Sequence, residues 1–127
     1  MSAQRRRRAY GRGRRAETMA AWWLRLKGYR IVARGFRAPL GEIDIIARRG
    51  RILALVEVKA RGDLATAREA LTRHQRKRIE NAATIFLQHH PALAGLDLRF
   101  DVVLVAPGRR PHHMTDAWRL ESAGPRA

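Results

Sequence analysis

Residues 41–60 read GEIDIIARRGRILALVEVKA, and this stretch decides the fold. Its two runs of Ile, Leu and Val predict strands at about 42–47 and 52–60. The link between them is short, polar and contains Gly50, which is typical of a β-hairpin. The two strands are therefore expected to be antiparallel neighbours.

Charged side chains interrupt both of these apolar strands. Because side chains alternate along a strand, Asp44 is expected to face away from Ile43 and Ile45. By the same rule, Glu57 and Lys59 share one face of the second strand. Two carboxylates and an ammonium group are costly to place in apolar strands, which favours a functional role for them.

The acidic residues suit a divalent metal ion. Asp44 and Glu57 offer hard oxygen ligands for Mg²⁺ or Mn²⁺, and the backbone carbonyl of Val58 can complete the set of ligands that the protein supplies. Such an ion activates water for attack on a phosphodiester, and Lys59 is placed to act there as a base or as an electrostatic clamp. The alternative is structural: Asp44 faces solvent at a strand end, and Glu57 pairs with Arg61 for less than about 1 kcal/mol.

The chain is strongly basic, with 27 Lys and Arg against 11 Asp and Glu and a net charge of +16. Such a charge attracts polyanions, so nucleic acid is the leading candidate partner. A ribosome-associated role and attraction to an anionic membrane surface stay open. The absence of cysteine excludes a thiolate catalyst and a disulfide framework. No stretch is long and apolar enough to span a bilayer, and we expect a cytoplasmic protein.

A length of 127 residues suits one domain. Residues 1–15 hold seven arginines, no acidic residue and no apolar periodicity, so they are expected to form a flexible basic arm. Residues 16–121 are expected to form the single domain, and residues 122–127 a disordered tail.

Two helices are predicted outside the hairpin. The first covers about residues 17–27 and ends at Gly28 as its C′ residue. The second begins with a capping box formed by Thr72 and Gln75, and its apolar residues recur on one stripe.

Further strands are predicted at 29–36 and 98–106, the latter buried on both faces, with a short edge element at 111–121. A helix separates the strands at 52–60 and 98–106, so these two are expected to pair in parallel. The fold class is therefore α/β, a mixed sheet in the order α-β-β-β-α-β flanked by helices.

Basic residues gather in the first turns of the second helix, where cations oppose the helix dipole. A bound phosphate would relieve this conflict, whereas solvent screening is the alternative. The residues concerned are Arg73, Arg76, Lys77 and Arg78.

Other polar residues are expected to be structural. Asp101 lies in an apolar strand and needs a partner such as Arg99. His112 and His113 are adjacent and lack the spacing of metal ligands, so they are expected on the surface.

The segments GEIDIIA, VEVKAR and RFDVVLV resemble the YraN family of uncharacterised bacterial proteins. That family resembles the PD-(D/E)xK nucleases, which share the restriction-endonuclease-like fold and include the archaeal Holliday junction resolvases. The resemblance implies that Asp44 and Glu57 are the metal-binding acids and that Lys59 is the lysine of the E-x-K triplet. It also implies that Glu17 supports a second metal or a water, and that Gln75 is a polar residue near the site.

The sequence thus favours a Mg²⁺-dependent endonuclease-like domain that acts on structured or branched DNA. A nucleic-acid-binding accessory protein with a vestigial nuclease site is the second reading, and a ribosomal or RNA-bound protein is the third. A homodimer is expected if the analogy with junction resolvases holds, because two strands must be cut.

Overall fold

The structure, a computed structural model, describes residues 3–60 and 71–120. Within these residues, five strands form one mixed sheet in the order β1-β2-β3-β4-β5, and two α-helices flank it. The predicted α/β class and the order α-β-β-β-α-β are confirmed, and a fifth strand extends the sheet. The elements are α1 (Ala3–Leu26), β1 (Arg30–Ala38), β2 (Gly41–Arg49), β3 (Ile52–Lys59), α3 (Arg73–His89), the 3₁₀ helix η1 (Pro91–Leu93), β4 (Asp97–Leu104) and β5 (His112–Trp118).

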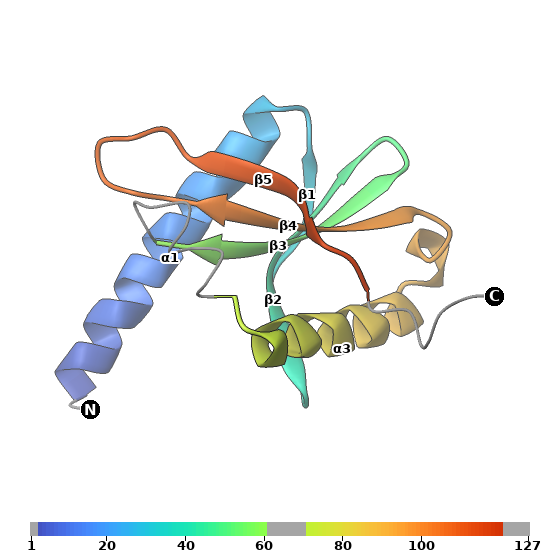
Figure 1. Ribbon diagram of the computed structural model, residues 1–127, viewed down its shortest axis with the longest axis horizontal. Helices are drawn as coiled ribbons and strands as arrows, with labels where there is room; N and C mark the ends of the chain where they lie inside the picture. The colour runs from blue at the N-terminus through green and yellow to red at the C-terminus, as the bar shows by residue number, and fades with distance from the viewer. Residues whose placement is uncertain (1–2, 61–70, 121–127) are drawn as a thin grey trace.

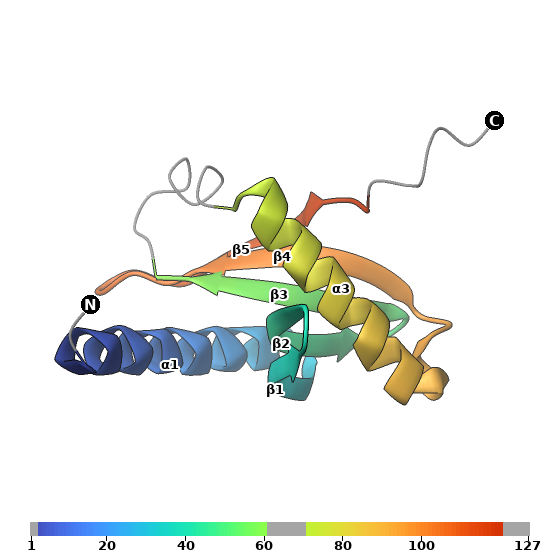
Figure 2. The same ribbon diagram turned by 90° about the horizontal axis from the view of Figure 1, so that it is seen from below.

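The two helices cover opposite faces of the sheet and give the molecule three layers (Figures 1 and 2). Helix α1 packs Ala20 and Leu24 on one face, and α3 packs Ile79 and Phe86 on the other. Among the described residues, neither helix combines the length and apolar character needed to cross a membrane.

The pairing of the strands agrees with the sequence prediction. Strands β2 and β3 form an antiparallel hairpin, and Gly50 in the turn has a φ of +60°. Strand β4 pairs in parallel with β3, and helix α3 makes the crossover that a parallel pair requires. Residues 100–104 of β4 are all buried, as expected for a strand covered on both faces.

Helix α1 differs from the prediction at its N-terminal end. It begins at Ala3 and therefore includes most of residues 1–15, which were expected to be a flexible arm. Alanine and arginine are strong helix formers, and a helix anchored on the sheet from Ala16 onward extends by one hydrogen bond per added residue. The expected tail at 122–127 lies outside the described residues.

Two predicted helix ends are confirmed. Gly28 has a φ of +91°, and its N–H donates to the Arg25 carbonyl at 3.0 Å, as in a Schellman ending. At the start of α3, the Gln75 N–H donates to Thr72 Oγ1 and the Thr72 N–H donates to Gln75 Oε1, both at 3.1 Å. The capping box therefore already engages the Gln75 side chain.

Gly41 allows α3 to lie directly on β2. A Cβ atom at this position would stand 1.8 Å from the Arg78 carbonyl oxygen, a backbone atom that cannot swing away. We expect Gly41→Ala to lower the free energy of unfolding by about 3 kcal/mol, measured by urea denaturation. Gly95→Ala is the control, because a Cβ there meets no atom within 4 Å. Equal denaturation midpoints for the two variants would contradict the close approach of α3 to Gly41.

Candidate functional site

Strands β2 and β3 separate next to Asp44. They run together from the hairpin and then diverge (Figure 1), and the ladder between them ends at the pair Ile45–Val56. Beyond this pair, the Val58 N–H donates to Asp44 Oδ2 at 2.8 Å. A side-chain carboxylate thus accepts a bond that a backbone carbonyl accepts elsewhere in a sheet. Strand β3 continues beside β4 as far as Lys59.

The separation changes the direction of the β2 side chains. Ile43 belongs to the apolar cluster under α3, whereas Ile45 belongs to the cluster under α1. The prediction that both face away from Asp44 on one side is therefore wrong. The prediction assumed that β2 stays beside β3, whereas β2 leaves β3 between these two residues and continues beside β1 alone.

The carboxyl groups of Asp44 and Glu57 lie close enough for each to shift the pKa of the other. Burial, and then the charge of Asp44, raise the pKa of Glu57 to about 8, although Lys59 opposes the shift. Burial also raises the pKa of Asp44, and the Val58 N–H opposes that shift. Two like charges this close cannot both ionise without cost, so a cation bound between them would stabilise the pair.

Lys59 lies against the same pair. Its Nζ is 3.3 Å from Glu57 Oε1, and both side chains are 16% exposed. They are therefore mostly shielded from water, which strengthens the attraction relative to a surface pair. The structure thus brings together Asp44, Glu57 and Lys59, as the sequence pattern predicted.

A cavity of about 810 Å³ opens beside Asp44. Glu17 and Val58 also line it, whereas Glu57 and Lys59 are not among its lining residues. Arg34 Nε donates to Glu17 Oε1 at 3.0 Å and holds this acid at the cavity, where its charge contributes to the raised pKa of Asp44. The cavity also has a basic lining, which consists of Arg14, Arg34 and Arg37.

The donor set fits a hard divalent ion. Mg²⁺ is commonly held by one or two carboxylates, with waters and substrate phosphate oxygens completing its shell. Asp44 and Glu57 supply two carboxylates, and Val58 lies next to both. No group of three or more His, Cys, Asp and Glu side chains suited to an ion is found in the parts of the chain that the structure describes.

The predicted residues of α3 are not among those that line this cavity. Gln75 serves in the helix cap, and Arg76 lines a different cavity. Arg61 lies outside the described residues. The remaining basic residues of the first turns are exposed, and they are Arg73, Lys77 and Arg78.

A second polar cluster surrounds Asp101, which is completely buried. Arg99 Nε and Nη2 donate to its two carboxylate oxygens at 2.9 and 2.8 Å, which confirms the predicted partner. The Asp116 N–H donates to it as well, at 2.9 Å. Burial alone would raise the pKa of Asp101, but the hydrogen bonds from His113 and Arg99 outweigh it and hold the pKa below its usual value.

His113 was expected on the surface, and this prediction is wrong. Its side chain is only 1% exposed, and its Nε2 lies 2.8 Å from Asp101 Oδ2. Lys27 Nζ lies 2.6 Å from His113 Nδ1. A lysine ammonium can only donate, so Nδ1 accepts and the proton on Nε2 is donated to Asp101. Its burial depends on Lys27 and Asp101, which come from two other elements, so no local sequence signal could have placed His113 inward.

Comparison with known proteins shows which family contains this fold and site. The model of the uncharacterised protein family UPF0102 matches residues 16–105. A UPF0102 protein of Parvibaculum lavamentivorans is 59% identical over 111 residues, which cover 87% of this chain and 84% of the relative. A UPF0102 protein of Paramagnetospirillum magneticum is 53% identical over 117 residues, which cover 89% of this chain and 91% of the relative. The chain therefore belongs to the UPF0102 family, the YraN-like family that the GEIDIIA and VEVKAR segments indicated.

Proposed function

We propose that this protein is a Mg²⁺- or Mn²⁺-dependent endonuclease that cleaves structured or branched DNA. The observation that carries the proposal is the proximity of the carboxyl groups of Asp44 and Glu57 where β2 and β3 separate, with Lys59 next to Glu57. The element order and the parallel pairing of β3 with β4 support a restriction-endonuclease-like topology.

The proposed chemistry assigns a role to each residue of the site. Asp44, Glu57 and the Val58 carbonyl would hold the ion. A bound ion would supply Lewis acidity that polarises the phosphate and lowers the pKa of the attacking water. Lys59 would hold a phosphate oxygen or that water and balance the charge that builds up during attack. Glu17, held by Arg34, would support a second ion or a water.

The basic surface would bind the nucleic-acid backbone. Arg34 and Arg37 line the cavity beside Asp44 and so would meet the phosphates next to the one that is cut. With a net charge of +16, the affinity should fall steeply as salt is added. Cutting two strands of a junction would require a homodimer, which sedimentation of the protein–DNA complex would detect. Phosphate contacts further away would come from Arg61, Arg73, Arg76, Lys77 and Arg78.

The test is cleavage of labelled duplex, flap and four-way junction DNA with Mg²⁺, Mn²⁺ or EDTA. We expect cleavage only with a divalent ion, and faster cleavage of branched than of linear DNA. Asp44→Ala and Glu57→Ala should both abolish it. Cleavage that persists in both variants would come from a contaminant, and a wild-type protein that cuts none of the substrates would contradict the proposal.

A second candidate is a non-catalytic accessory protein that binds nucleic acid and keeps a vestigial site. One observation favours it: both acids already have partners in the chain, Asp44 with the Val58 N–H and Glu57 with Lys59. Such a protein would bind DNA or RNA without a divalent ion and after Asp44→Ala. Calorimetric titration with Mn²⁺ separates the two candidates, because only the nuclease requires an ion site that Asp44→Ala removes.

A further inference from the structure

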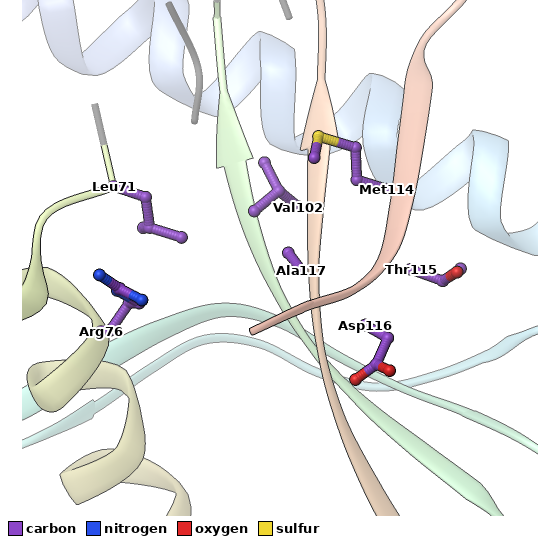
Figure 3. A pocket seen from close by; sticks show the side chains of 7 residues that line it. All are labelled: Leu71, Arg76, Val102, Met114, Thr115, Asp116 and Ala117. Carbon is purple, nitrogen blue, oxygen red and sulfur yellow. The ribbon is translucent and has the colours of Figure 1, made fainter. Parts of the chain in front are cut away.

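A second cavity, of about 410 Å³, lies between the start of α3 and strands β4 and β5. Leu71 and Arg76 line it from the side of α3, and Val102 and Met114 line it from the sheet (Figure 3). This volume falls in the range of small-molecule sites.

The wall on the side of α3 carries a donor without an acceptor. The Nε atom of Arg76 is buried and has no hydrogen-bond partner among the residues that the structure describes. A buried charged donor without a hydrogen-bond partner lowers the stability of the folded state. The planar fork of a guanidinium group matches the oxygens of a phosphate, which would complete the missing bond.

The opposite wall combines the apolar Val102, Met114 and Ala117 with the polar Thr115 and Asp116, and it is shaped by an irregularity of β5. Between the pairs that β5 makes with Phe100 and Val102, the register shifts, and Asp116 adopts a φ of +54°. The Asp116 carboxylate is itself paired with Arg119 at 2.9 Å, which reduces its repulsion of an anion. Apolar side chains next to polar ones, facing one unsatisfied guanidinium, suit a ligand with a flat aromatic face, polar edges and a phosphate, and a nucleotide has all three.

The sheet register places this cavity beside the acid pair. Glu57 is the partner of Val102 across the β3–β4 ladder, and Val102 is the partner of Met114 across the β4–β5 ladder. Neighbouring strands are about 4.8 Å apart, so the cavity begins one strand away from Glu57. A nucleic-acid strand whose phosphate reached the acids would therefore bring an adjacent nucleotide to this wall.

We propose that the cavity binds one unpaired nucleotide, with the phosphate on Arg76 and the base against Val102 and Met114. The proposal rests on the proposed nuclease function and deepens it, because a pocket for a single unpaired nucleotide gives a reason for selecting branched over linear DNA.

The test is the binding of deoxynucleoside monophosphates to the full chain, in EDTA, by calorimetry. Arg76→Gln should weaken binding at least tenfold, while Arg30→Gln, an equal loss of charge at an exposed position of β1 that does not line the cavity, should change it less than twofold. Equal losses in both variants would overturn the proposal, and so would inorganic phosphate that binds as tightly as the nucleotide.

The NMR signals of the methionine methyl groups test the same site in the wild-type protein. This experiment does not require that any variant folds. Added nucleotide should shift the Met114 methyl signal and leave that of Met19, which is exposed on α1, unchanged. Equal shifts, or none at Met114, would overturn the proposal.

These measurements need no metal and no cleavage, so the two proposals can fail separately. Arg76-dependent nucleotide binding in a protein that cuts no DNA would refute the nuclease function and leave the pocket standing. Cleavage of branched DNA by the wild-type protein, together with equal nucleotide affinities of the Arg76→Gln and Arg30→Gln variants, would refute the pocket alone.

Discussion

Asp44→Asn is expected to reduce the proposed cleavage rate by about a thousandfold or more while leaving the protein folded. An amide is a poor ligand for Mg²⁺ compared with a carboxylate, but its oxygen can still accept the hydrogen bond from the Val58 N–H. Removing a charge next to Glu57 also removes repulsion within the buried pair. Single-turnover cleavage of junction DNA and urea denaturation would measure the two effects.

Glu42→Gln is the matched control for this variant. Glu42 lies two residues away on the same strand and lines the same cavity, but it is exposed, and its contact with Arg37 is long, at 3.9 Å. Its replacement is expected to change the cleavage rate less than about threefold, since exposed pairs contribute little. If both variants lost activity alike while staying folded, Asp44 would not be the proposed ligand, and an Asp44→Asn variant that unfolded would contradict the retained bond to the Val58 N–H.

Asp101→Asn is expected to lower the free energy of unfolding by about 3–5 kcal/mol. The substitution leaves Arg99 partly buried without its counter-charge, and an amide nitrogen cannot accept the bonds that both carboxylate oxygens now accept. Denaturation in urea at neutral pH would measure the loss. Asp97→Asn, at an exposed position on the same strand, is the control and should cost less than about 0.5 kcal/mol. Equal stability of the two variants would contradict a structural role for Asp101.

The pH dependence of stability provides a second test of the structural role of the Asp101 carboxylate. Because the pKa of Asp101 in the folded protein lies below its ordinary value of 3.8, the unfolded chain binds the proton more readily. Its contribution to stability is therefore present above about pH 4 and is lost as the pH falls through the lower pKa of the folded state. The stability difference between wild type and Asp101→Asn should shrink on acidification from pH 5 toward pH 2. A constant difference across that range would show that the charge of Asp101 is not what stabilises the fold.

The parts of the fold that depend on local signals could be predicted from the sequence. The hairpin at Gly50, the capping box at Thr72 and the helix ending at Gly28 each depend on a few consecutive residues. The parallel pairing of β3 with β4 followed from the length of the helix between them. The convergence of Asp44 with Glu57 followed from the expected hairpin pairing.

The rest depends on contacts between distant segments, which alternation and local propensity do not describe. The opposite directions of Ile43 and Ile45 follow from where β2 leaves its partner, and no residue in that stretch signals the departure. The burial of His113 depends on Lys27 and Asp101, which come from two other elements. The adjacency of His112 and His113 in the sequence carried no information about Lys27 or Asp101.

The hydrogen bond from Val58 to Asp44 also bears on how this family can evolve. If the proposed function holds, one side chain would be under selection for two reasons, because its oxygen accepts a bond between two diverging strands and its carboxylate is the proposed ion ligand. A single nucleotide change converts an aspartate codon to an asparagine codon, and this exchange would keep the strands joined. Lineages released from selection for activity should therefore drift at this position to asparagine before alanine, which would leave the Val58 N–H without an acceptor. The residue found there across the family would then record where the chemistry has been kept.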